Sequence, residues 1–108
     1  MRMFFFLAMA LALAATAQAR GNAEAGKARA AQVCAACHGP EGNKPSAPDQ
    51  PVIAGQYYDY IVQTLSDYKS GKRSNPIMKA FAGQLSKKDM EDLAAWFSSQ
   101  RTTLHNQR

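Results

Sequence analysis

The chain has 108 residues, of which 13 are Lys or Arg and eight are Asp or Glu, and its formal net charge is +5. A chain of this length forms one domain with a thin hydrophobic core. The basic excess is too small to indicate a nucleic-acid partner by itself.

Residues 1–19 have the layout of a secretory signal peptide. Arg2 is followed by an apolar run over 3–15, and Ala17 and Ala19 place small residues at the cleavage-determining positions. The apolar run is shorter than the roughly 20 residues that a membrane-spanning helix needs, and an uncleaved anchor is the alternative. We therefore expect 1–19 to be removed on export, 20–108 to form the mature domain, and the periplasm to be its compartment.

The first helix is predicted over about 22–36. The segment is rich in Ala, and its polar and acidic first residues suit a helix start. Gly26 and Ala30 lie four residues apart, so another helix could approach closely on that face. Leu93 and Trp96, on the last predicted helix, are the expected partners.

This helix ends in Cys34-Ala-Ala-Cys37-His38, and C-x-x-C-H is the attachment sequence of a c-type haem. Two thiols at this spacing can each add to one vinyl group along the same edge of a porphyrin. His38 is then carried under the ring, where an imidazole nitrogen can bind the iron. The motif occurs once in the chain, so it predicts one haem c, covalently attached through Cys34 and Cys37.

Three other interpretations of the motif are weaker. A dithiol redox pair usually accompanies a βαβ pattern, and the sequence shows no strand-like alternation. A structural zinc site needs four ligands, but the chain has no third Cys and only one other His, His105. A simple disulfide would leave the adjacent His without a role.

Loops and two further helices are predicted after the motif. Residues 38–55 are rich in Gly and Pro and are expected to form a loop. Residues 56–70 show apolar and Tyr residues at helical spacing, with Gly71 at the C-cap position. After a polar loop over 72–76, residues 86–100 form the third helix, which begins with a Ser-x-x-Asp sequence resembling a capping box. These elements predict an all-α fold.

The order of these motifs resembles class I cytochromes c, in particular short bacterial monohaem types and single halves of dihaem ones. The resemblance implies a class I fold, with three main helices and loops wrapped around one covalently bound haem. It rests on segments spread over the whole mature chain, namely 34–38, 51–56, 69–78 and 85–97.

The resemblance also implies His38 and a Met sulfur as the two axial iron ligands. The Pro51 carbonyl would accept a hydrogen bond from the other nitrogen of His38 and thereby fix its tautomer. Once 1–19 is removed, only Met78 and Met90 remain. Met90 lies on the apolar face of a predicted helix, where Met usually fills the core. Met78 lies in a stretch without clear periodicity and is the expected ligand; His105 in the C-terminal tail is the rival.

His/Met ligation raises the reduction potential and fills both axial positions, which suits the passage of single electrons. We therefore expect a periplasmic electron carrier and no enzyme activity. Its expected partners are redox proteins, such as a quinol–cytochrome c oxidoreductase, a terminal oxidase or a periplasmic dehydrogenase or reductase, with membrane contact only through them. The alternatives are a five-coordinate haem protein that binds or reduces a small ligand such as peroxide, and a fixed haem subunit of a larger respiratory complex.

Two further groups of side chains have no assigned role. Six basic residues cluster around Met78 in sequence, and they either steer the protein to an acidic partner or form an ordinary solvated surface. The tyrosines at 57, 58 and 60 are expected to be wall and core, and the sequence does not say which of them would reach a haem propionate. The basic residues are Lys69, Lys72, Arg73, Lys79, Lys87 and Lys88.

Overall fold

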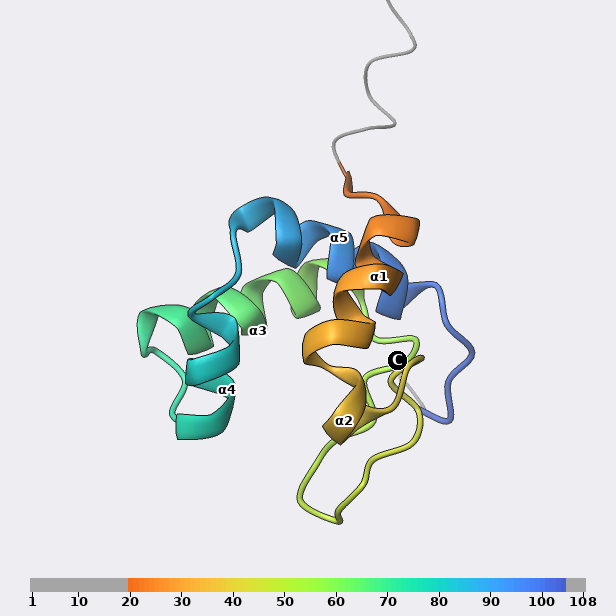
Figure 1. Ribbon diagram of the computed structural model, residues 1–108, viewed down its shortest axis with the longest axis horizontal. Coiled ribbons are helices and arrows are strands. Elements are labelled where there is room, and N and C mark those ends of the chain that lie inside the picture. The colour runs from red at the N-terminus through yellow and green to blue at the C-terminus, as the bar shows by residue number, and fades with distance from the viewer. Residues whose placement is uncertain (1–19, 105–108) are drawn as a thin grey trace, which may run out of the picture.

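The computed structural model describes residues 20–104, which form five helices (Figure 1). Three are long, which confirms the predicted all-α fold with three main helices, and two are short. Residues 1–19, which are expected to be a signal peptide, and His105 lie outside the described residues. The helices are α1 (Ala23–Val33), α2 (Ala35–His38), α3 (Tyr58–Ser70), α4 (Pro76–Ala82) and α5 (Lys87–Ser98).

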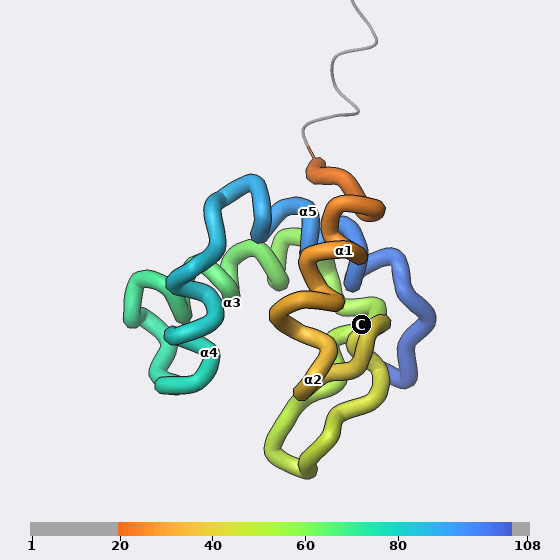
Figure 2. The backbone as a smooth tube through the Cα atoms, viewed as in Figure 1, coloured from red at the N-terminus to blue at the C-terminus, as the bar shows by residue number. Residues whose placement is uncertain are grey.

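The long helices pack around α5. α1 and α3 both contact α5, and α4 contacts α3. Figure 2 shows α4 on one side of the molecule, with α2 and the loop that follows it on the other. Within residues 20–104, no helix is long and apolar enough to cross a membrane.

α1 and α5 cross at a point where α1 has almost no side chain. A Cβ atom added at Gly26 would collide with the backbone carbonyl of Asp92 and would lie 2.9 Å from Cβ of Trp96. Ala30, one turn further on, is fully buried in the same cluster as Leu93. The predicted crossing is therefore confirmed, and Asp92 is an additional partner.

Asp92 also fixes the start of α1. Its Oδ1 accepts a hydrogen bond from the backbone N–H of Asn22 at 2.8 Å, and its Oδ2 lies 2.7 Å from Nζ of Lys88. Asn22 is the N-cap of α1, because its side chain accepts a hydrogen bond from the Ala25 N–H at 3.0 Å. Although Asp92 is only 5% exposed, its charge is paired and hydrogen-bonded, as a buried carboxylate requires.

The first helix is shorter than predicted. α1 ends at Val33, and Cys34 has φ −113°, well away from the ideal helical value, before α2 begins. The N–H of His38 then bonds to the Cys34 carbonyl at 3.0 Å, so the attachment motif forms its own single turn. The third helix follows the prediction closely, beginning one residue after Ser86.

The core is small. Phe97 and Leu93, both on α5, are the largest fully buried side chains of the described residues. Met90 is 4% exposed and belongs to this core, as its position on the apolar face of the helix predicted. Such a thin core leaves room for a cofactor to contribute much of the buried apolar surface.

The capping box of α5 allows a stability test. The Ser86 side chain accepts from the Asp89 N–H at 3.0 Å, and Asp89 accepts from the Ser86 N–H at 2.9 Å. We expect Asp89→Ala to lower the free energy of unfolding by about 1 kcal/mol, because the Ser86 N–H loses its acceptor. Lys87→Ala, an exposed neighbour in the same turn, should change it by less than about 0.5 kcal/mol. Equal effects in urea titrations of the two variants would contradict this role.

The same contact predicts a pH dependence. The hydrogen bonds from Ser86 hold the pKa of the Asp89 carboxyl below its ordinary value of 3.8. The pKa of this carboxyl is lower in the folded chain than in the unfolded chain. Its stabilisation is therefore complete above the pKa of the unfolded chain and is lost as pH falls through the pKa of the folded chain. The difference in stability between the parent and Asp89→Ala should therefore shrink between pH 5 and pH 2 as the carboxyl becomes protonated, roughly as linkage requires.

Candidate functional site

The attachment motif places one thiol against the core. Cys34, at the break between α1 and α2, packs against the buried cluster, and burial raises the pKa of its thiol to about 11. Cys37 is half-buried. The two cysteines do not form a disulfide. Both thiols are therefore available for the thioether bonds that the motif predicts.

His38 is held by the loop that follows it. The side chain is 8% exposed, and Nδ1 lies 2.9 Å from the Pro51 carbonyl oxygen. Because a carbonyl can only accept, Nδ1 carries the proton and Nε2 is left with a lone pair. The structure thus brings His38 and Pro51 into the contact that the family resemblance implies, and Nε2 is the atom able to bind a metal.

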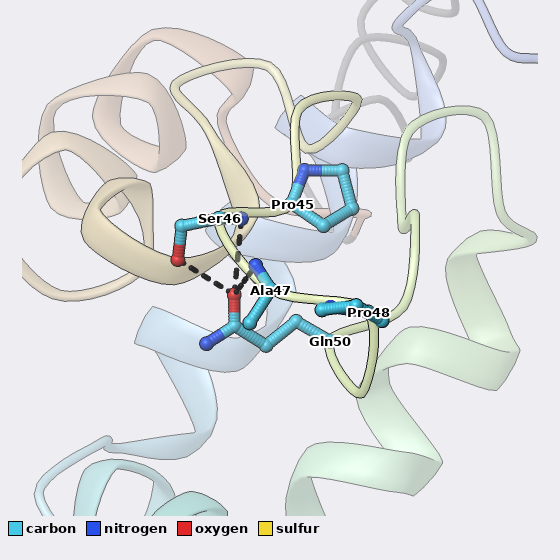
Figure 3. Close-up of a pocket in the computed structure, with 5 residues that line it drawn as sticks. All are labelled: Pro45, Ser46, Ala47, Pro48 and Gln50. Atoms are coloured by element: carbon cyan, nitrogen blue, oxygen red, sulfur yellow. Dashed lines mark hydrogen bonds between the residues drawn. The ribbon is translucent and has the colours of Figure 1, made fainter.

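The turn before Pro51 is fixed by one side chain. Oε1 of Gln50 accepts hydrogen bonds from the N–H and Oγ of Ser46 and from the N–H of Ala47, at 3.1, 2.8 and 3.1 Å (Figure 3). Pro45 and Pro48 flank a shallow hollow here, whose lining contains no titratable side chain. These hydrogen bonds fix the turn that directly precedes Pro51.

A cavity of about 430 Å³ lies on the open side of the motif. This volume is in the range of cofactor and ligand sites. The cavity brings together Cys34, His38, Pro51 and Met78, all of them predicted from the sequence, although Cys37 is not in its wall. The other lining residues are Asp49, Val52, Ile53, Gln56, Tyr60, Ile61, Thr64, Leu65, Tyr68, Arg73, Asn75, Leu93 and Phe97.

Met78 lies in a helix, so the expectation of an irregular stretch was wrong. Asn75 caps α4, accepting hydrogen bonds from the N–H groups of Ile77 and Met78 at 3.1 and 3.0 Å, and Pro76 is its first residue. This is the arrangement that favours a helix start. Met78 is thus the third residue of α4, half-buried and in the cavity wall.

The six basic residues have different surroundings. Among them only Arg73 lines the cavity. Nζ of Lys69 donates to the Leu85 carbonyl at 2.5 Å, and Lys88 pairs with Asp92 on α5. Steering of an acidic partner by these charges stays a prediction. It would depend mainly on the basic residues that do not contact another part of the chain.

Only one of the three neighbouring tyrosines lines the cavity. Tyr60, which is 49% exposed, is in its wall, whereas Tyr58 packs against the core and Tyr57 is exposed. Tyr68 and Arg73 line it as well, and sequence analysis did not place the three in one site because Arg73 follows the end of α3.

The cavity fits a flat, largely apolar macrocycle. Its walls combine Ile61, Leu65, Leu93 and Phe97 with a His nitrogen and, from a separate helix, a Met side chain. These are a proximal nitrogen and a soft sulfur, the ligand types of electron-transfer haem proteins.

Comparison with known proteins agrees with this site. Residues 21–97 match the family model described as cytochrome c oxidase, cbb3-type, subunit III. The chain belongs to this cytochrome c family. Its cofactor is therefore haem c, attached through the cysteines of the C-x-x-C-H motif.

Several relatives of this cytochrome c domain are longer proteins. Cytochrome c4 of Pseudomonas aeruginosa is 45% identical over 84 residues, covering 78% of this chain and 41% of the relative. The thiosulfate dehydrogenase electron acceptor of Stutzerimonas stutzeri is 40% identical over 72 residues, covering 67% and 33%. The chain thus spans less than half the length of either one.

A solved structure shows the same fold. The crystal structure of reduced recombinant cytochrome c4 from Pseudomonas stutzeri superposes with a TM-score of 0.68 and 42% identity, covering 75% of this chain and 46% of that one. This confirms the class I cytochrome c fold of the domain, which is similar to one part of the larger cytochrome.

Proposed function

We propose that this cytochrome c domain is a periplasmic carrier of single electrons whose iron is bound by His38 and Met78. The observation that carries the proposal is that both side chains line one cavity next to the attachment motif. When bound, haem iron accepts and releases one electron at a time. The chain's own contribution is to fix the two ligands and to keep the site largely apolar.

Each ligand has a distinct effect. The Pro51 carbonyl accepts the Nδ1 proton of His38, which orients the ring and makes Nε2 more basic. The Met78 sulfur is a soft, neutral ligand that favours ferrous iron and so raises the reduction potential. If His38 and Met78 both bind the iron, peroxide or O₂ would find no open position, so catalysis on such a substrate is not expected.

Partners follow from this role. A relative is named the electron acceptor of thiosulfate dehydrogenase, which supports exchange of electrons with a redox enzyme. A periplasmic dehydrogenase, a quinol–cytochrome c oxidoreductase or a terminal oxidase would serve as donor or acceptor. The signal-peptide layout of residues 1–19 supports export of the domain to the periplasm.

The test of this proposal is the optical spectrum of the purified ferric protein. Sulfur ligation gives ferric haem a weak charge-transfer band at the red end of the visible spectrum. We expect the band in the parent, its loss in Met78→Ala, and its retention in Met90→Leu, which changes the buried Met of α5. A parent protein without the band and with high-spin features would contradict the electron carrier and would indicate a ligand-binding haem protein instead.

A second candidate is a fixed haem subunit of a respiratory complex. The matching family model is described as a subunit of a cytochrome c oxidase, which favours this alternative. N-terminal sequencing of the mature protein separates the two. A chain that begins at Arg20 in the periplasmic extract supports the free carrier, whereas a membrane-bound chain that keeps 1–19 supports the subunit.

A further inference from the structure

The loop that follows the attachment motif is closed at a narrow neck. The Gly42 carbonyl accepts hydrogen bonds from the N–H groups of Ile53 and Ala54, at 2.8 and 3.0 Å. We call Gly42, Ile53 and Ala54 the neck of this loop. Gly42 and Ala54 are buried, and the turn that precedes Pro51 lies between them in the chain. Because Pro51 comes only two residues before Ile53, the position of its carbonyl depends on the position of the neck.

His38 is attached to the same neck from the other side. It lies shortly before Gly42 in the chain, and its carbonyl accepts a hydrogen bond from the N–H of Lys44 at 3.1 Å. The Nδ1 atom of His38 lies 2.9 Å from the Pro51 carbonyl oxygen. A displacement of the neck would therefore change the hydrogen bond that orients the His38 ring.

The last turn of α5 holds the buried side of the neck. The Phe97 carbonyl accepts a hydrogen bond from the N–H of Gly55 at 2.8 Å, directly after the neck. The ring of Phe97 lies against Gly42, where an added Cβ atom would be 2.8 Å from Cδ1. Since Phe97 is only 2% exposed, this side of the neck is part of the core.

Trp96, on the same turn of α5, holds the outer side. Its Nε1 donates a hydrogen bond to the Pro40 carbonyl at 2.9 Å, across 56 residues of sequence. Pro40 is exposed and lies between His38 and the neck. An indole nitrogen can only donate, so this contact exists for as long as the Pro40 carbonyl points at Trp96. The hydrogen bond therefore fixes the segment that joins His38 to the neck.

The indole of Trp96 is itself fixed by the crossing of α1 and α5. Its Cβ would lie 2.9 Å from a Cβ atom added at Gly26, and Nζ of Lys27 lies 5.5 Å from its ring centre. The side chain is half-buried and packs against the core. Figure 1 shows α1 and α5 side by side, with the loop that follows α2 below them. Trp96 thus connects the helix crossing to the loop.

We propose that Trp96 is a positioning residue for the iron ligand His38. Its indole N–H holds the start of the loop and, through the neck, the hydrogen bond between Pro51 and His38. Trp96 is absent from the cavity wall, so it acts through the loop and has no direct contact with the space for the haem. The inference rests on the proposed binding of the iron by Nε2 of His38.

Removal of the indole N–H should raise the reduction potential. Without its donor, the exposed Pro40 carbonyl can turn to water, and the Pro51 carbonyl is held less firmly against Nδ1 of His38. A weaker hydrogen bond at Nδ1 makes Nε2 less basic, which disfavours ferric iron. The ratio of ferric to ferrous protein at a fixed ambient potential should therefore fall, by roughly twofold to fivefold for one neutral hydrogen bond that acts through a loop.

The experiment removes the N–H and keeps the shape of the side chain. Trp96 is the one tryptophan of the chain, so growth of a tryptophan auxotroph on an analogue changes this position alone. In 3-benzothienylalanine a sulfur atom replaces the N–H, whereas 5-fluorotryptophan keeps the N–H and is the matched control. Redox titration of the haem-loaded protein gives the potential, and hydrogen exchange followed by mass spectrometry gives the opening of residues 39–55.

We expect both readouts to change in the benzothienyl protein. The ferric fraction falls as stated, and the amides of 39–55 exchange roughly threefold to tenfold faster. Exchange in α3 and both readouts in the fluorinated protein should stay within about twofold of the parent. An unchanged potential would overturn the inference, whether or not the loop opens more often. Equally faster exchange in α3 and in the loop would also overturn it, because Trp96 would then only stabilise the fold.

The red-end band separates this inference from the ligation of Met78. A parent protein without the band contradicts that ligation, while a faster-exchanging loop together with a lower ferric fraction still supports the role of Trp96. Loss of the band in the benzothienyl protein alone would overturn the inference, because the altered potential would then arise at Met78. Trp96→Phe, which also lacks the N–H, is a second variant to which the same outcomes apply.

Discussion

A variant in which serine replaces both Cys34 and Cys37 is expected to retain no covalently attached haem. Serine hydroxyls do not add to the vinyl groups under the conditions in which the thiols do, because the reaction depends on sulfur nucleophilicity. The cavity of about 430 Å³ would then have no haem bonded to the chain beside it. The fraction of chains carrying haem on a denaturing gel should fall from nearly all to none.

The control for this variant is Ala36→Ser. Ala36 lies between the two cysteines and is exposed, so it introduces the same hydroxyl into α2 without removing a thiol. Haem staining and intact mass should match the parent. Single Cys34→Ser and Cys37→Ser chains should keep haem through one bond, and haem that stays attached to the double variant through denaturation would contradict the attachment site.

The long helices could be predicted because their signals are local. Gly71 ends α3 in the left-handed conformation, and Ser86 begins α5 with a capping box. Both are recognised from neighbouring residues alone. The C-x-x-C-H motif is equally local, and with it the positions of His38 and the two cysteines along the chain could be stated from the sequence.

The parts that could not be predicted depend on short elements or distant contacts. α4 has seven residues, too few for a helical period to show, and its Asn-Pro start was taken for a loop. Asp92 bonds to the Asn22 N–H across 70 residues, and Arg73 meets Tyr60 across 13. No local pattern records such pairs, because the first depends on the packing of α5 against the start of α1 and the second on the path of the chain after α3.

The candidate site also has parts that could be predicted from the sequence and parts that could not. His38 was predicted from the C-x-x-C-H motif and a Met ligand from the resemblance to class I cytochromes c. Met78 was preferred because Met90 belongs to an apolar helix face. The presence of Tyr60, Tyr68 and Arg73 in the cavity wall was not predicted, because each has an ordinary surface role when considered alone. Only the packing of α3 against the loop before α4 shows that they surround one space.

Gly26→Ala is expected to lower the free energy of unfolding by about 3 kcal/mol, near the upper end of overpacking effects, because the new Cβ collides with backbone. The obstacle is the Asp92 carbonyl of α5, which cannot move aside as a flexible side chain could. Helix propensity alone predicts the opposite sign, a gain of about 1 kcal/mol from replacing Gly by Ala. Urea titration of the haem-loaded protein, followed by far-UV circular dichroism, gives the difference.

Ala31→Gly is the matched control for this prediction. Ala31 lies on the same helix and is exposed, so the reverse substitution should cost about 1 kcal/mol through propensity alone. If α1 were a helix without a close partner, the two substitutions would have effects of opposite sign. We expect both substitutions to destabilise the domain, Gly26→Ala more strongly. The absence of a side chain at Gly26 is what lets α1 and α5 cross closely. This crossing holds the attachment motif, at the end of α1, against the core. A Gly26→Ala protein more stable than the parent would show that the crossing can open without cost.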